Sequence, residues 1–204
     1  MIAYKGFHKD LNCTMGKGNF QYEPGKWYRE EDAKCANKGF HATDNPLDVL
    51  SYYDGEEDRY FIVNLRGNID EDGVRSRIAA PEIKLLKELT RDELYREGVY
   101  WMSSHEKAPW AAAVRKESGD ADGKGNVVVR GKDPKARGEL GDNLYIVREN
   151  KAGEIVEIGA FKVDGVKILP ETYYNVNGGE VVDKKGTGKA KNTKCHTGND
   201  KSTE

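Results

Sequence analysis

Residues 38–53 read Lys38-Gly-Phe-His-Ala-Thr-Asp-Asn-Pro-Leu-Asp-Val-Leu-Ser-Tyr-Tyr53. A glycine turn opens this stretch, and a short strand, Phe40-His-Ala42, follows it. Asp44 or Asn45 then caps a helix that has Pro46 in its first turn, because a side-chain oxygen at the cap accepts a backbone hydrogen bond and proline is tolerated at the first helical position. The stretch therefore predicts a strand and a capped helix that ends in a pair of tyrosines.

The sequence on both sides of this stretch predicts a module of mixed α and β structure. Residues 59–66 alternate between the two sides of a strand. Thr90 is a good cap for a helix that runs to about Trp101, and residues 30–37 predict a short helix that ends at a lysine and a glycine. We therefore expect the fold class α+β, with an α+β head over residues 1–107.

Residues 108–183 contain many glycines between short β segments. In the first half of this range, small and β-branched residues recur about every eight positions. They are Ala113, Ala121, Val129, Ala136 and Leu144. A helix needs a shorter period and disfavours glycine, so the pattern predicts a short glycine-rich β-solenoid or β-meander, with a glycine-rich mobile loop as the alternative. An antiparallel β cap is expected to follow, with a hairpin over residues 161–168, where an Asp-Gly dipeptide favours a tight turn.

Residues 184–204 are rich in lysine, glycine and threonine and have no apolar period, which predicts a disordered basic tail. The 33 basic and 35 acidic residues of the whole chain give a formal net charge of −2, so we expect no specific nucleic-acid binding. No apolar run approaches the roughly 18 residues of a membrane span, and we therefore expect a cytoplasmic protein without a membrane partner.

The sequence predicts no metal site, no cofactor and no catalytic residue. The three cysteines have no metal-ligand spacing, and Asp120 and Asp122 lack the later glutamate of a calcium loop. We interpret Cys13 and Cys35 as buried thiols, and whether they touch each other is left open.

Several motifs together resemble an uncharacterised protein family of bacteriophages and prophages. They are Tyr4-Lys-Gly-Phe7, Gly39-Phe-His-Ala42, Pro46-Leu-Asp-Val49 and Tyr52-Tyr53. In that family the leading module is followed by Ser-Val-Ala-type β-solenoid repeats and a closing β segment. The resemblance implies a phage-associated protein that works in the host cell cytoplasm. Similarity of the repeats to trimeric β-rolls implies a homo-oligomer, by analogy a trimer.

Polar and aromatic side chains of the leading module predict a ligand-binding site. Its expected members are Tyr4, His41, Thr43, Tyr52 and Tyr53. Aromatic rings stack on planar groups and their polar atoms form hydrogen bonds, which suits a small nucleotide-like ligand. The alternative for His41 is a hydrogen-bonded structural histidine.

We therefore expect a binding protein rather than an enzyme: a phage-associated accessory protein, with counter-defence as its role, that binds a host protein or sequesters a small nucleotide-type ligand. The order of strand, helix and tyrosines also loosely resembles ADP-ribosyltransferases, which implies an enzyme that uses a nicotinamide dinucleotide with His41 and Thr43 in its pocket. Glu154 and Glu157 do not have the spacing of that family's glutamate motif. A structural virion component is a second alternative.

Overall fold

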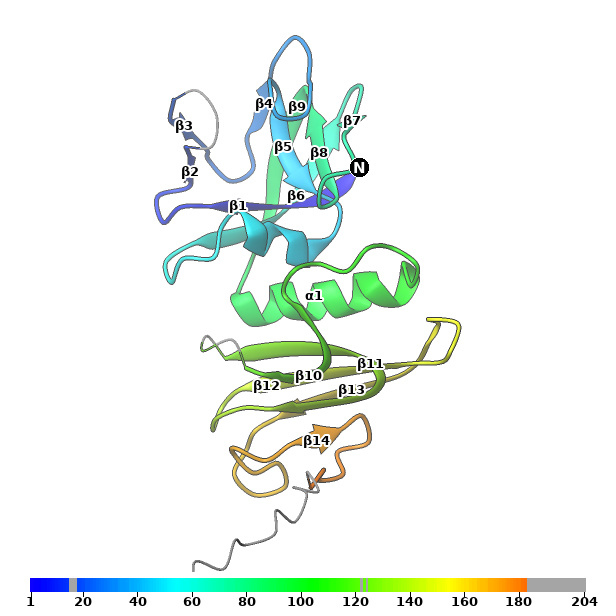
Figure 1. The fold of residues 1–204 in the computed structure, drawn as a ribbon. Coiled ribbons are helices and arrows are strands. Elements are labelled where there is room, and N and C mark those ends of the chain that lie inside the picture. Colours follow the sequence, from blue (N-terminus) through cyan, green and yellow to red (C-terminus); the bar gives the residue numbers. More distant parts are fainter. Residues whose placement is uncertain (15–17, 122, 124, 183–204) are drawn as a thin grey trace, which may run out of the picture.

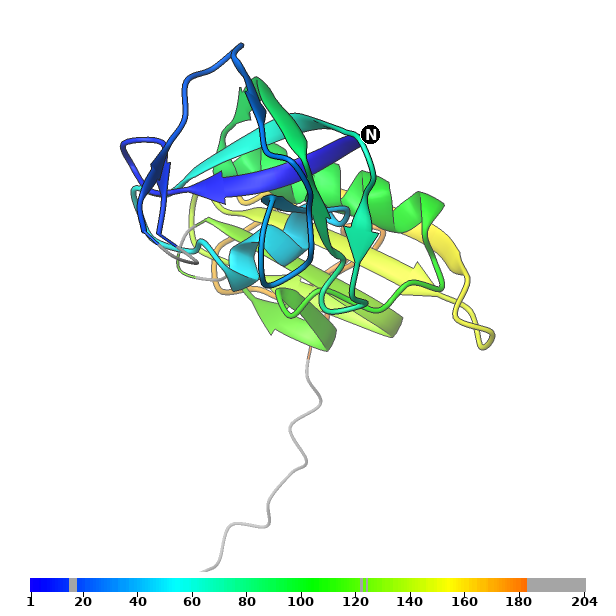
Figure 2. The same ribbon diagram turned by 90° about the horizontal axis from the view of Figure 1, so that it is seen from above.

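The computed structural model describes residues 1–14, 18–121, 123 and 125–182. Two β-sheets lie at opposite ends of the molecule, and helix α1 (Arg91–Ser104) runs between them (Figure 1). The view from above shows α1 and the shorter helix η1 (Pro46–Ser51) lying across the strands (Figure 2). The predicted basic tail, residues 184–204, lies outside the described residues.

The first sheet has seven strands, and each strand is antiparallel to its neighbours. Their spatial order is β4 (Trp27–Arg29), β9 (Glu82–Leu89), β6 (Arg59–Arg66), β1 (Ile2–Phe7), β5 (Phe40–Thr43), β8 (Arg77–Ala80) and β7 (Asp70–Glu71). A separate pair, β2 (Asn12–Cys13) and β3 (Phe20–Gln21), stands beside this sheet. The strand predicted at residues 59–66 is therefore present, in the interior of the sheet between β9 and β1.

Both helices begin where the sequence places their caps. Asn45 caps η1, since its Oδ1 accepts the Leu47 amide proton at 3.0 Å, and Pro46 occupies the first turn; the helix is a 3₁₀-helix. Thr90 and Glu93 form a reciprocal capping box at the start of α1.

The short helix expected at residues 30–37 is wrong. Lys34 pairs with Lys38 in an isolated β-bridge across a turn, and the Cys35 amide donates to Asp70 on β7 at 2.8 Å. A contact from a distant strand therefore replaces the helical hydrogen bonds. Within the part of the chain that the structure describes, fourteen strands accompany two helices, so the molecule is mostly β and the expected class α+β is wrong as well.

The second sheet contains five strands: β10 (Val114–Asp120), β11 (Asn126–Arg137), β12 (Asn143–Glu149), β13 (Ile155–Lys162) and β14 (Tyr174–Asn175). β10, β11 and β12 are parallel neighbours, with Asn126 opposite Asn143. β13 returns antiparallel to β12, and β14 is antiparallel to β11.

The β-solenoid expected in residues 108–183 is wrong, because no coil closes. After β12 the chain reverses in a tight turn in which the Asn150 amide donates to the Glu154 carbonyl, so β13 pairs with β12 and ends the parallel stacking. The hairpin expected at residues 161–168 is also wrong. β13 runs on to Lys162, and Asp164 Oδ1 accepts the amide protons of three following residues, which folds them into a compact turn.

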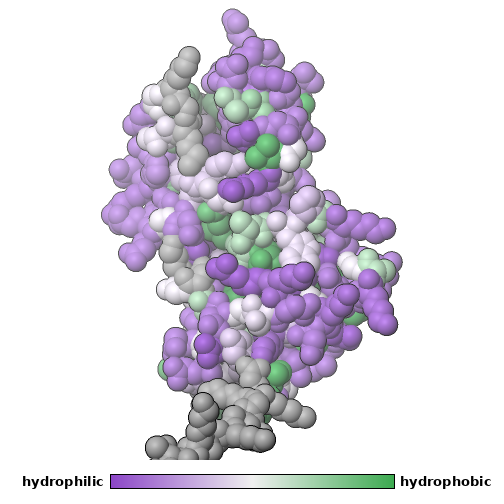
Figure 3. All heavy atoms as spheres, viewed as in Figure 1, coloured by the Kyte–Doolittle hydropathy of each residue, from purple (hydrophilic) through white to green (hydrophobic). Residues whose placement is uncertain are grey.

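Helix α1 joins the cores of the two sheets. One apolar cluster contains residues from η1, from α1 and from the second sheet: Leu47, Tyr95, Val99, Met102, Ala111, Val114, Val128, Tyr145 and Val147. Gly98 lets η1 approach α1 closely, since a Cβ there would lie 2.3 Å from Leu47 Cγ. On the face shown in Figure 3, apolar side chains gather between the two sheets, and hydrophilic side chains cover most of the rest. Among the described residues, no helix is long and apolar enough to cross a membrane.

Candidate functional site

A cavity of about 470 Å³ opens where strands β1 and β5 diverge. Within the described residues these two strands share one register pair, Tyr4 with Thr43, whereas β1 pairs with β6 along its whole length. The space beyond that pair is walled by β1, β5, the turn before β5, the end of η1 and aromatic residues near β3. The cavity is thus a gap in the first sheet that side chains only partly fill.

Lys5 lies at this gap and is a buried residue. The residue is 8% exposed, and its Nζ donates to the His41 carbonyl oxygen at 2.7 Å. Nζ also lies 5.4 Å from the ring centroid of Phe7 and 5.6 Å from that of Tyr22. No carboxylate of the described residues forms an ion pair with Lys5. A buried cation without a counter-charge is unusual, because a charge removed from water is normally paired.

Aromatic rings form another part of the cavity wall. The ring centroids of Phe20 and Phe40 are 5.6 Å apart, and Tyr22 lies 4.7 Å from Phe20, with the rings tilted or edge to face. Burial raises the pKa of Tyr22, which keeps its hydroxyl neutral. Phe20 is 39% exposed. The wall therefore offers apolar ring surface to a planar group.

His41 carries the turn that closes one end of the cavity. Its Nε2 accepts the Ala36 amide proton at 3.0 Å. Burial lowers the pKa of His41, and the positive charges of Lys5 and Arg77 lower it further, so the ring is neutral near pH 7. This contact agrees with the interpretation of His41 as a hydrogen-bonded structural histidine.

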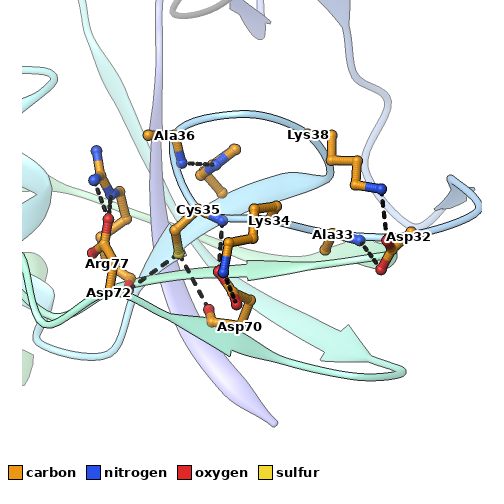
Figure 4. Close-up of polar contacts among 10 residues, drawn as sticks. Asp32, Ala33, Lys34, Cys35, Ala36, Lys38, Asp70, Asp72 and Arg77 are labelled. Atoms are coloured by element: carbon orange, nitrogen blue, oxygen red, sulfur yellow. Dashed lines mark hydrogen bonds and ion pairs between the residues drawn. The ribbon is translucent and has the colours of Figure 1, made fainter.

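The same turn is fixed from its outer side by Asp70 (Figure 4). The Asp70 carboxylate accepts hydrogen bonds from the Cys35 amide at 2.8 Å and from the Lys34 ammonium group at 3.0 Å. The Cys35 thiol donates to the backbone carbonyl oxygen of Asp70 at 3.2 Å. The hydrogen bond from the Cys35 amide, with that from Lys34, lowers the pKa of Asp70. Arg77 forms an ion pair with Asp72 nearby.

Tyr4 and Thr43 line the cavity, but their hydroxyl groups are already bonded within the protein. Tyr4 donates to Glu97 on α1 at 3.2 Å, and burial together with Glu97 raises its pKa to about 12. Thr43 Oγ1 donates to the Asn45 carbonyl oxygen at 2.9 Å. Both residues therefore hold the walls in place.

Tyr53 packs directly on strand β1. A Cβ at Gly6 would lie 2.6 Å from Tyr53, so glycine is required there for the close approach. Burial raises the pKa of Tyr53, and its hydrogen bond with Cys13 raises it further. Tyr52 is half-buried and also lines the cavity.

The structure thus brings all five residues of the sequence-predicted site to one cavity, while their role in ligand binding stays a prediction. Sequence reasoning missed Lys5, Tyr22 and Phe40 as members of the site. The sequence does contain a signal for Lys5, which is a charged residue within an otherwise apolar strand. Lysine is rarely buried, so a lysine at such a position points to a special role.

Cys13 and Cys35, the cysteines among the described residues, lie in separate environments. Cys13 belongs to the core of the first sheet and Cys35 to a small cluster with Ala33 and Ala79, and both thiols are free. The described residues contain no cluster of three or more histidine, cysteine, aspartate or glutamate side chains arranged to hold a metal ion.

Comparison with known proteins relates the first sheet to an uncharacterised domain. No curated protein and no solved structure matches the chain. The model of a domain of unknown function, DUF7666, matches residues 1–97, a range that contains every residue lining the cavity.

Proposed function

We propose that this protein is a binding protein that sequesters a small nucleotide-type ligand in the cavity between β1 and β5. The observation that carries the proposal is the buried residue Lys5, whose ammonium group lies near aromatic rings and has no carboxylate partner among the described residues. A nucleotide combines a planar ring with anionic groups, and this cavity offers ring surface and positive charge side by side.

The size of the cavity supports a small ligand. Its volume of about 470 Å³ falls in the range of roughly 300 to 1,000 Å³ that is typical of small-molecule sites. A concave site of this kind favours a small molecule over a host protein, which would need a larger and flatter surface. The proposal includes a counter-defence role in the host cytoplasm, which only the resemblance of the leading module to phage proteins supports.

Binding without a reaction fits the contacts of His41 and Thr43. Both side chains already bond to the backbone, and no acidic residue of the cavity lining is placed to act with them: Glu30 accepts the Gly39 amide proton at 2.9 Å. The proposal therefore assigns positioning roles to these residues.

Native mass spectrometry of the purified chain tests the proposal. We expect the folded protein to carry the additional mass of a bound small molecule. Denaturation should release this molecule, and its ultraviolet absorption spectrum should be that of a nucleobase. Phe20→Ser, at the rim of the cavity, should reduce the bound fraction. Leu140→Ser, at an exposed apolar residue in the loop between β11 and β12, is the matched control and should retain the ligand.

Two results would contradict the proposal. One is a protein that carries no ligand and binds none of a panel of nucleotides. The other is release of nicotinamide from a nicotinamide dinucleotide, which would favour the enzyme alternative. The same spectrum gives the subunit number and so tests the predicted homo-oligomer.

A further inference from the structure

We infer that Lys5 is the anion-binding residue of the cavity and that the ligand places a phosphate or another oxyanion against its Nζ. This inference rests on the proposed function and specifies which group of the ligand the protein recognises.

The cations that line the cavity differ in their partners. Lys38 forms an ion pair with Asp32 at 2.6 Å, and Arg77 forms one with Asp72. Lys5 is the lining cation for which the described residues supply no carboxylate. It is also the most deeply buried of the three.

The ammonium group of Lys5 has capacity for a ligand. It carries three protons, and one of them goes to the His41 carbonyl oxygen. That oxygen is available because β5 leaves β1 after the pair Tyr4–Thr43. The rings of Phe7 and Tyr22 flank Nζ but accept no strong hydrogen bond. An oxyanion in the cavity would supply both the missing acceptors and the missing charge.

Arg130 shows how this chain treats a buried cation that has a structural role. Its Nε donates to Glu149 at 2.9 Å, and its Nη2 donates to the carbonyl oxygens of Glu106 and Gly153 at 2.7 and 3.1 Å. Arg130 is 2% exposed and borders none of the described cavities. Arg130 is neutralised within the protein, whereas Lys5 is not neutralised by any of the described residues. We therefore infer that the counter-charge of Lys5 comes from a bound ligand.

Calorimetric titration of the full chain, dialysed free of ligand, tests the inference. The probes are inorganic phosphate, AMP and neutral adenosine. The variants are Lys5→Met, which removes the charge at similar length, and Lys5→Arg, which keeps it. Lys26→Met is the matched control, because the Lys26 ammonium lies 5.3 Å from the ring of Tyr28 but is exposed and outside the cavity. Circular dichroism verifies that each variant is folded.

We expect AMP to bind the wild-type chain and Lys5→Met to bind it roughly ten- to hundredfold more weakly, as for a lost hydrogen bond to a charged group. Lys5→Arg and Lys26→Met should stay closer to wild type, and adenosine should respond little to any of the variants. Phosphate that stabilises wild type against heat, but not Lys5→Met, would support the same conclusion without a nucleotide.

The outcomes separate the inference from the proposed function. If AMP binds wild type and Lys5→Met equally, the anion site is wrong and the nucleotide cavity stands. If phosphate binding depends on Lys5 but no nucleotide binds, the anion site stands and the nucleotide proposal is wrong. If neither phosphate nor AMP binds the wild-type chain, both are wrong.

Discussion

The two sheets of this protein each bury one cation, and they treat it differently. In the second sheet, Arg130 is enclosed by Glu149, by two backbone carbonyl oxygens and by the Trp110 ring, whose centroid lies 5.0 Å from the guanidinium. In the first sheet, Lys5 has one carbonyl oxygen, the rings of Phe7 and Tyr22 and a cavity, but no carboxylate among the described residues. The second sheet is complete by itself, whereas the first leaves a charge that a ligand can neutralise.

The difference follows from strand pairing. β11 and β12 stay in register over six residue pairs, which holds Arg130 between neighbouring strands and close to Glu149 at the end of β12. β1 and β5 separate after one pair, and Lys5 lies at that separation. A continuous sheet is thus able to satisfy its own buried charge, and a divergent pair of strands creates room for a binding site.

The largest effect is expected in the second sheet. Glu149→Ala leaves Arg130 buried without its carboxylate and should lower the free energy of unfolding by about 3–5 kcal/mol. Glu157→Ala breaks the more exposed ion pair with Arg148 and should cost about 0–1 kcal/mol. Urea denaturation of both variants measures the difference. Equal losses would show that burial does not distinguish the two pairs.

Lys5→Met, in contrast to Glu149→Ala, should change the free energy of unfolding only slightly. Loss of the hydrogen bond to the His41 carbonyl opposes the gain from removing an unpaired buried charge, so the stability of the ligand-free chain should stay within about 1 kcal/mol of wild type. The same urea titration measures it. A loss as large as that of Glu149→Ala would make Lys5 a structural cation like Arg130 and end the contrast.

His41 should give the first sheet a pH dependence near neutrality. Its pKa in the folded state lies below the ordinary value of 6.5, so the unfolded chain binds the proton more readily. Its contribution to stability is therefore complete above pH 6.5 and is lost as the pH falls toward the lowered folded-state pKa. Thermal unfolding between pH 5 and 7 measures this loss. His41→Gln should remove it, and His105→Gln, outside the cavity, should leave it unchanged.

Replacement of Asp70 should have the smallest effect on stability, and the effect should be confined to the turn that forms one wall of the cavity. Its folded-state pKa is lowered, so its contribution is present above the ordinary aspartate range near pH 4 and is lost as the pH falls below it. Asp70→Asn should speed hydrogen exchange at the Cys35 amide, which donates to this carboxylate. Asp32→Asn, an exposed carboxylate of the same segment, should not. Unchanged exchange in Asp70→Asn would show that His41 alone holds the turn.

The sequence predicted the elements whose signals are local. Asn45 and the Thr90 capping box start the two helices, and the alternation at residues 59–66 gives the interior strand β6. The candidate site was partly predictable, because Tyr52 and Tyr53 directly follow the capped helix. Its aromatic wall was not, since Tyr22 and Phe40 meet only through the packing of separate strands.

The elements that were wrongly predicted depend on distant partners. The turn at residues 34–38 is held by Asp70, on strand β7, whose carboxylate accepts a hydrogen bond from the Cys35 amide. The parallel strands of the second sheet form no solenoid, because the reversal before Glu154 returns the chain against β12. In both places a long-range hydrogen bond or strand pairing overrides the local pattern.

The sequence by itself determined the caps, strand β6 and the neighbourhood of His41, because each depends on side chains within a few residues of one another. Only the tertiary structure decided that β1 and β5 diverge and that Lys5 is buried there without a carboxylate, while Arg130 receives Glu149. Which counter-charge reaches a buried cation depends on the register of strands far apart in the chain, and no local pattern encodes it.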